Sequence, residues 1–169
     1  MKRGFFTIMS AQFFSSLADN ALFVAAVQLL RSSGSDEWQQ AALIPMFALF
    51  YVVLAPFVGA VADALPKGRV MLYSNGIKIV GCLIMLFGNH PLISYAIVGL
   101  GAAAYSPAKY GILTELLPAS QLVKANGWIE GLTIASIILG VLLGGQLVGH
   151  AASTYLLSFD FPLIDTGID

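Results

Sequence analysis

The chain has 169 residues and a net charge of -1, and 58% of its residues are hydrophobic whereas only 10% are charged. Soluble globular domains carry about 25% charged residues, so this composition, with a mean hydropathy of +0.85, indicates an integral membrane protein. The sequence has no basic patch and no Cys/His spacing for a metal site. We therefore expect no nucleic-acid partner, no metal and no cofactor.

Five apolar stretches are long enough to cross a bilayer, which requires about 20 mostly apolar residues. Polar or turn-rich segments separate them, so we predict an all-α bundle of transmembrane helices within residues 1–149. Residues 150–169 are expected to be an extracytoplasmic tail or the truncated start of another segment, as in a fragment of a longer chain. The predicted helices cover residues 5–30, 41–62, 70–88, 92–113 and 128–148.

The first stretch contains an acid, Asp19, near its middle, with Asn20 beside it. Gln12, Ser15 and Asp19 recur at helical spacing, so their polar atoms share one stripe. A carboxylate at this depth is costly unless it faces a partner or water. We interpret Asp19 as a charged residue facing a central cavity. The alternative is a protonated, hydrogen-bonded structural aspartate.

The segment "GAVADALPKGRV", residues 59–70, joins the second and third predicted helices. Gly59 is expected to permit close helix contact, and Asp63 ends the second helix. Lys67, Gly68 and Arg69 follow directly. We interpret these five residues as a gate at the cytoplasmic side. A plain basic loop, held in the cytoplasm by its charge, is the alternative.

Three more charged side chains lie inside the predicted spans. Lys78 is on the third, Lys109 follows Pro107 on the fourth, and Glu130 belongs to a polar face on the fifth. Either lysine is a candidate counter-charge for Asp19, and Lys109 is also a plausible partner of Glu130. Alternatively, the lysines extend their ammonium groups to the membrane surface.

The distribution of basic residues predicts the orientation, because lysine and arginine favour cytoplasmic loops. Lys2 and Arg3 precede the first helix, and Lys124 precedes the fifth. The segment between the second and third helices is also basic. We therefore predict a cytoplasmic N-terminus.

Three blocks of sequence together resemble one family. "DNAL" (19–22), "VADALPKGRVM" (61–71) and "GAAAYSPAKYGIL" (101–113) are similar to the bacterial lysophospholipid transporter family of the major facilitator superfamily. The resemblance extends from about residue 12 to residue 145. The third block is the most specific. The second departs from the superfamily's usual spacing, because Gly68 follows Asp63 by five residues rather than three, and it looks like this family's own variant.

This resemblance implies a fold and a function. Members have twelve helices in two halves of six, so this chain would be most of the N-terminal half, and the remainder of the transporter would be its partner. They move lysophospholipids, such as lysophosphatidylethanolamine, across the bacterial inner membrane to the cytoplasmic leaflet by alternating access. A cytoplasmic acyltransferase and acyl-carrier-protein synthetase system then re-acylates them.

In this interpretation Asp19 meets the ammonium group of the substrate and a lysine meets its phosphate. No enzyme constellation is evident, so we expect a transporter rather than an enzyme. Two alternatives are an efflux transporter of amphipathic drugs on the same fold and a non-transporting membrane scaffold. The candidate substrate-binding residues are Asp19, Asn20, Lys78, Lys109 and Glu130.

Overall fold

The computed structural model describes residues 3–149, and within this range the chain forms six helices and no strand. The tail predicted for residues 150–169 lies outside the described residues. The all-α prediction is confirmed. The helices are α1 (Arg3–Ser32), α2 (Glu37–Val53), α3 (Ala55–Ala64), α4 (Lys67–Leu86), α5 (Pro91–Leu116) and α6 (Ala119–Leu147).

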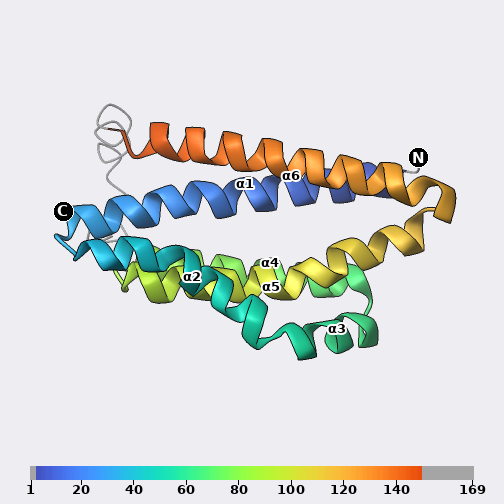
Figure 1. Ribbon diagram of the computed structural model, residues 1–169, viewed down its shortest axis with the longest axis horizontal. Coiled ribbons are helices and arrows are strands. Elements are labelled where there is room, and N and C mark those ends of the chain that lie inside the picture. The colour runs from blue at the N-terminus through green and yellow to red at the C-terminus, as the bar shows by residue number, and fades with distance from the viewer. Residues whose placement is uncertain (1–2, 150–169) are drawn as a thin grey trace, which may run out of the picture.

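The helices form two layers (Figure 1). One layer is the pair α1 and α6, which run in the same direction because Gly140 lies against Leu17 and Gly144 lies against Ala21. The other layer contains α2, α4 and α5, with α5 packed against both of its neighbours. The helix α3 diverges from α2 and lies beside α5 at the edge of this second layer.

Four of the described helices are long and apolar enough to cross a membrane, namely α1, α4, α5 and α6. The remaining predicted helix, residues 41–62, is not continuous, because it breaks at Leu54 into α2 and α3. Pro56 is in the first turn of α3, where its missing N–H needs no partner, and it cannot donate the hydrogen bond to the Val52 carbonyl oxygen that a continuous helix would need. The two short helices together occupy the stretch predicted as one span.

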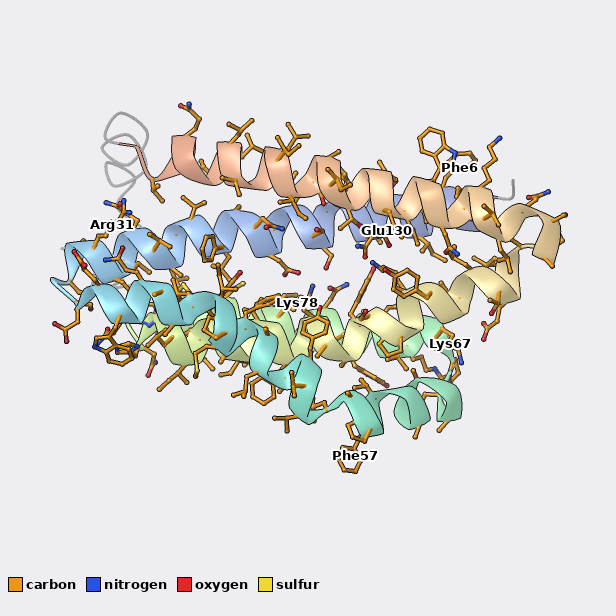
Figure 2. All side chains as sticks on the ribbon, viewed as in Figure 1. Phe6, Arg31, Phe57, Lys67, Lys78 and Glu130 are labelled. Carbon is orange, nitrogen blue, oxygen red and sulfur yellow. The ribbon has the colours of Figure 1, made fainter. Side chains whose placement is uncertain are left out.

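Large apolar side chains cover the outside of the bundle, including Phe6 on α1 and Phe57 on α3 (Figure 2). A soluble monomer rarely exposes so much apolar surface, whereas hydrocarbon accommodates it. Inside, buried apolar clusters lie toward the two ends of the bundle. One surrounds Leu30 and Val98, and another surrounds Phe5 and Ile129.

Glycines on α6 permit its close approach to α1. A Cβ added at Gly140 would lie 2.5 Å from the Leu17 carbonyl oxygen, and one at Gly144 would lie 2.9 Å from that of Ala21. Small residues allow such contact between helices in lipid, where dispersion and weak polar contacts replace the hydrophobic effect. Gly145, the next residue along α6, faces open space, because nothing lies within 4 Å of its added Cβ.

We predict that Gly140→Ala lowers the stability of the bundle by roughly 1–3 kcal/mol, because the added methyl group overpacks the α1–α6 contact. Gly145→Ala is the matched control, and it should be neutral or slightly stabilising because alanine favours helix more than glycine does. Thermal unfolding of the purified chain in lipid nanodiscs measures both. Equal effects of the two substitutions would contradict the close packing described for Gly140.

Candidate functional site

A polar cavity of about 280 Å³ lies between the two layers. Its walls come from every long helix and from α2, and its lining mixes charged, hydroxyl and aromatic side chains. The apolar clusters at the two ends of the bundle leave this polar region between them. The lining residues are Gln12, Ser15, Ser16, Asp19, Asn20, Phe47, Tyr51, Lys78, Tyr95, Ala102, Tyr105, Ser106, Lys109, Thr133 and Ile137.

An ion pair between α1 and α4 crosses this cavity. Lys78 Nζ lies 2.5 Å from Asp19 Oδ2, and the side chains of Lys78 and Asp19 are only 9% and 15% exposed. Figure 2 shows Lys78 in the middle of the bundle, at a level far from either end. Of the two lysines predicted as partners of Asp19, the structure therefore pairs it with Lys78.

Further contacts hold the lysine of the pair. Lys78 Nζ also donates to Ser15 Oγ at 3.0 Å, and Ser15 Oγ donates to Asn75 Oδ1 at 2.9 Å. The ammonium group lies 5.3 Å from the centre of the Tyr105 ring, within the range of a cation–π contact. Lys78 is therefore surrounded by acceptors and a π face, which offsets the cost of burying its charge.

The other polar residues of α1 bind within their own layer. Gln12 Nε2 donates to Thr133 Oγ1 on α6 at 3.2 Å. Asn20 Nδ2 donates to the backbone oxygen of Ser16 at 2.8 Å, so the side-chain oxygen of Asn20 is left for the cavity that it lines. The polar stripe predicted for α1 thus contributes to both the cavity wall and the α1–α6 contact.

Gly101 on α5 makes room for the lysine stem. A Cβ at this position would lie 2.7 Å from Lys78 Cγ and 2.6 Å from the Ser74 carbonyl oxygen. Because α4 and α5 approach closely here, Lys78 leaves α4 along the surface of α5 and enters the cavity. Any larger residue at 101 would displace that stem.

Lys109 also lines the cavity and is buried, but its predicted pairing with Glu130 is not formed. Its Nζ lies 4.4 Å from the centre of the Tyr110 ring. Glu130 accepts a hydrogen bond from Tyr110 Oη at 2.6 Å. Glu130 is exposed and is not among the cavity-lining residues. Tyr110 therefore stands between the two charges that the sequence suggested would meet.

The segment interpreted as a gate is anchored by Lys67. Its Nζ donates to the Ala62 carbonyl oxygen at 2.9 Å and lies 3.9 Å from Glu115 Oε1. These contacts connect the end of α3 and the start of α4 to the end of α5. Gly111 gives Lys67 space, because a Cβ there would lie 2.9 Å from Lys67 Cε.

Two of the other predicted gate residues, Gly59 and Gly68, face open space. A Cβ added at Gly59 or Gly68 would meet nothing within 4 Å, so the close helix contact expected at Gly59 is not formed among the described residues. Arg69 is exposed. The side chain of Asp63 lies outside the described residues.

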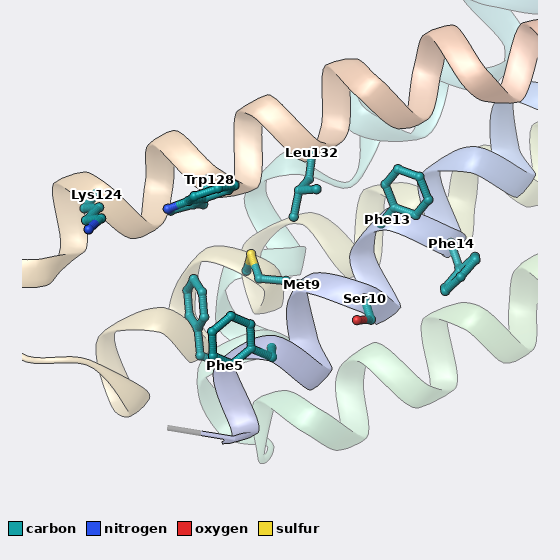
Figure 3. Close-up of a pocket in the computed structure, with 9 residues that line it drawn as sticks. Phe5, Met9, Ser10, Phe13, Phe14, Lys124, Trp128 and Leu132 are labelled. Atoms are coloured by element: carbon teal, nitrogen blue, oxygen red, sulfur yellow. The ribbon is translucent and has the colours of Figure 1, made fainter. Parts of the chain in front are cut away.

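A second hollow, of about 560 Å³, lies between α1 and α6 and shares no lining residue with the polar cavity (Figure 3). Most of its side chains are aromatic or aliphatic, with Lys124 and Trp128 contributed by α6. It contains no acid, and apart from Lys124 and Ser10 its lining offers a surface for hydrocarbon. We call it the apolar groove.

Sequence reasoning missed the tyrosines of the polar cavity, namely Tyr51, Tyr95 and Tyr105. Each looks like an ordinary apolar-face residue in the sequence, and the only signal is a hydroxyl group within a transmembrane helix. Across residues 3–149 no group of His, Cys, Asp and Glu side chains is placed to hold a metal ion.

We predict that Asp19→Asn and Lys78→Gln each destabilise the bundle by about 3–5 kcal/mol, because each leaves a buried charge without its partner. The double variant should recover much of this loss, since neither charge then remains. Thermal unfolding in nanodiscs provides the double-mutant cycle. Strictly additive losses would show that the two side chains do not interact energetically.

Comparison with known proteins agrees with the architecture. Residues 8–162 match the Major Facilitator Superfamily. The chain is 47% identical over 161 residues to the lysophospholipid transporter LplT of Cronobacter sakazakii, covering 93% of this chain and 41% of that protein. It is 50% identical over 147 residues to the protein of the same name from Yersinia enterocolitica, covering 87% of this chain and 36% of that protein.

The chain thus spans less than half the length of these curated relatives. Both relatives are named as transporters and not as enzymes, in agreement with the function class expected from the sequence. No solved structure matches the chain. The superfamily match covers far more than half of the sequence, and the helical bundle is of the expected kind, so the chain belongs to the Major Facilitator Superfamily.

Proposed function

We propose that this chain forms part of a transporter that moves lysophospholipids, such as lysophosphatidylethanolamine, across a bacterial inner membrane toward the cytoplasmic leaflet. The observation that carries the proposal is a cavity that holds charges of both signs inside an otherwise apolar bundle. Ionisable residues inside a membrane are costly, and those that line a cavity commonly mark a substrate path. The names of the relatives support the same substrate class.

The chemistry of the cavity suits a zwitterionic headgroup. Asp19 has a second carboxylate oxygen beyond the one that Lys78 contacts, so it can accept a hydrogen bond from an ammonium group. Asn20 lines the same wall and adds an amide oxygen. A lysine of the cavity meets the phosphate. Glu130 lies outside the cavity and is not assigned to the substrate.

Transport by alternating access requires the rest of the transporter as the opposite wall. In this proposal the N-terminus is cytoplasmic, and the contacts of Lys67 hold the cytoplasmic side closed in one of the two states. A cytoplasmic acyltransferase and acyl-carrier-protein synthetase then consumes the delivered lysophospholipid. Gate contacts of this kind change the balance between states and not the affinity of the site.

Efflux of amphipathic drugs is the alternative function on the same fold. It differs in its substrate chemistry, because a cationic drug needs only an acid in the cavity. The efflux alternative assigns no role to the buried Lys109, although Lys109 lines the same cavity as Asp19. A non-transporting scaffold would need neither charge.

The test uses a complete transporter in which this chain replaces the matching segment of the Cronobacter sakazakii relative. We predict that Asp19→Asn reduces lysophosphatidylethanolamine uptake by at least about tenfold, because the loss of one contact to a buried charge costs more than about 1.4 kcal/mol. Asp19→Glu should keep part of the activity, because it retains the charge on a longer side chain. Uptake of radiolabelled substrate into cells measures both.

Glu37→Gln is the matched control, because Glu37 is an exposed acid at the start of α2. Its uptake should equal that of the parent, and membrane insertion of all variants is checked by immunoblot. An inserted Asp19→Asn protein that transports at the parental rate would overturn the headgroup assignment. The efflux alternative would be favoured if the parent took up no lysophospholipid and Asp19→Asn abolished resistance of the cells to amphipathic drugs.

A separate prediction concerns the gate. Lys67→Gln removes the ion pair with Glu115, so it should change the transport rate severalfold while leaving substrate affinity within about twofold of the parent, since the residue does not line the cavity. Rates come from uptake and affinities from equilibrium binding to the purified protein. Lys124→Gln, which alters an exposed lysine on α6, is the control. A parallel loss of affinity and rate would contradict a gating role.

A further inference from the structure

Two lysines line the polar cavity, but only one has acceptors. An ammonium group has three N–H donors. Lys78 directs its own toward Asp19 and Ser15, and the face of the Tyr105 ring lies beside it. An incoming anion would have to displace these contacts. Lys78 is therefore the positioning residue of Asp19, and it is poorly placed to receive a second negative group.

Lys109, in contrast to Lys78, has no acceptor among the described residues. It is only 8% exposed and lines the same cavity, yet it forms no hydrogen bond or ion pair with any described residue. Its ammonium group rests on the Tyr110 ring, while Tyr110 Oη uses the nearby carboxylate of Glu130. A buried ammonium without an acceptor is costly, so this arrangement points to a negative group that the cavity receives from outside.

Tyr105 supplies a second unused donor. Its hydroxyl oxygen is buried without a hydrogen-bond partner among the described residues, and the side chain is 4% exposed. Tyr105 and Lys109 are four residues apart on α5, so they lie on one face of the helix, and both line the cavity. A phenol hydroxyl can donate to an anionic oxygen as strongly as many side-chain donors do.

From these two observations we infer that Lys109 and Tyr105 form an anion subsite of the polar cavity, which takes the phosphate of a lysophospholipid headgroup. The inference rests on the proposed function and makes it more specific, because it assigns the phosphate to Lys109 and Tyr105 and leaves Asp19 for a cationic group. The non-bridging oxygens of a phosphodiester accept from both donors. A free phosphate ion has the same chemistry, so the test must separate the two sources.

The experiment measures equilibrium binding to the purified complete transporter, in which this chain replaces the matching segment of the Cronobacter sakazakii relative, in lipid nanodiscs. Four probes are used: lysophosphatidylethanolamine, lysophosphatidylglycerol, which lacks the ammonium group, monoacylglycerol, which lacks the phosphate, and inorganic phosphate as a competitor. The variants are Lys109→Gln, Lys109→Arg, Tyr105→Phe and Asp19→Asn. Lys124→Gln and Tyr73→Phe are matched controls, because Lys124 and Tyr73 are exposed.

We expect Lys109→Gln to lower the binding affinity for both phosphate-bearing lipids by about tenfold or more, as the loss of a charge-assisted hydrogen bond implies. Tyr105→Phe should weaken both by severalfold, and Lys109→Arg should retain most of the affinity. Binding of monoacylglycerol should not change in these variants. Asp19→Asn should lower the affinity for lysophosphatidylethanolamine more than the affinity for lysophosphatidylglycerol, because only the former carries an ammonium group.

Two results would overturn the subsite. One is parental binding of both phospholipids by Lys109→Gln, and the other is an equal loss of monoacylglycerol binding, which would indicate a collapsed cavity. Displacement of the lipids by millimolar inorganic phosphate would overturn the headgroup assignment and identify a free anion as the ligand. A parental complete transporter that binds none of the three lipids would instead overturn the proposed function, so the two failures are distinguishable.

Discussion

The ion pair between Asp19 and Lys78 is the constraint around which the rest of the bundle is arranged. It joins α1 to α4, two helices whose remaining contact is slight, and thereby ties the two layers together at mid-height. An ion pair in a low-dielectric interior is stable only when both charges keep enough partners. Besides Asp19, Lys78 contacts Ser15 and the Tyr105 ring, and Ser15 is in turn held by Asn75, so the polar cavity persists between apolar ends.

Small residues determine how closely the helices around this pair can approach. Gly101 brings α5 against the stem of Lys78, and Gly140 brings α6 against α1 beside Asn20. This close approach is between helices of the same layer, and polar side chains of both layers line the cavity between them. The glycines and the charged side chains therefore act together. The glycines determine the spacing of the cavity walls, and the charged side chains keep the cavity polar.

Much of the fold could be predicted from the sequence, because each long helix is a separate apolar run and hydropathy depends only on local composition. The break at Leu54 was missed because hydropathy ignores backbone geometry, and Pro45 lies within α2 without ending it. Asp19 was recognised by its depth. Its partner could not be chosen, since the choice between Lys78 and Lys109 depends on which helices pack together. For the same reason the sequence left the pairing of Glu130 with Lys109 only plausible, and in the structure Glu130 accepts a hydrogen bond from Tyr110 instead.

The balance of charge in the cavity separates the possible substrates. Its charged lining consists of one acid, Asp19, and two lysines, which leaves one positive charge in excess. A cationic amphiphile would add a second unbalanced positive charge, and like charges repel strongly where water is scarce. A zwitterion adds none, and it can place its phosphate at Lys109 while its ammonium group lies at Asp19. Glu130 moderates the excess from outside the cavity through Tyr110 without occupying the N–H donors of Lys109. The cavity is therefore complementary to a ligand that carries both charges, and less so to a cation alone.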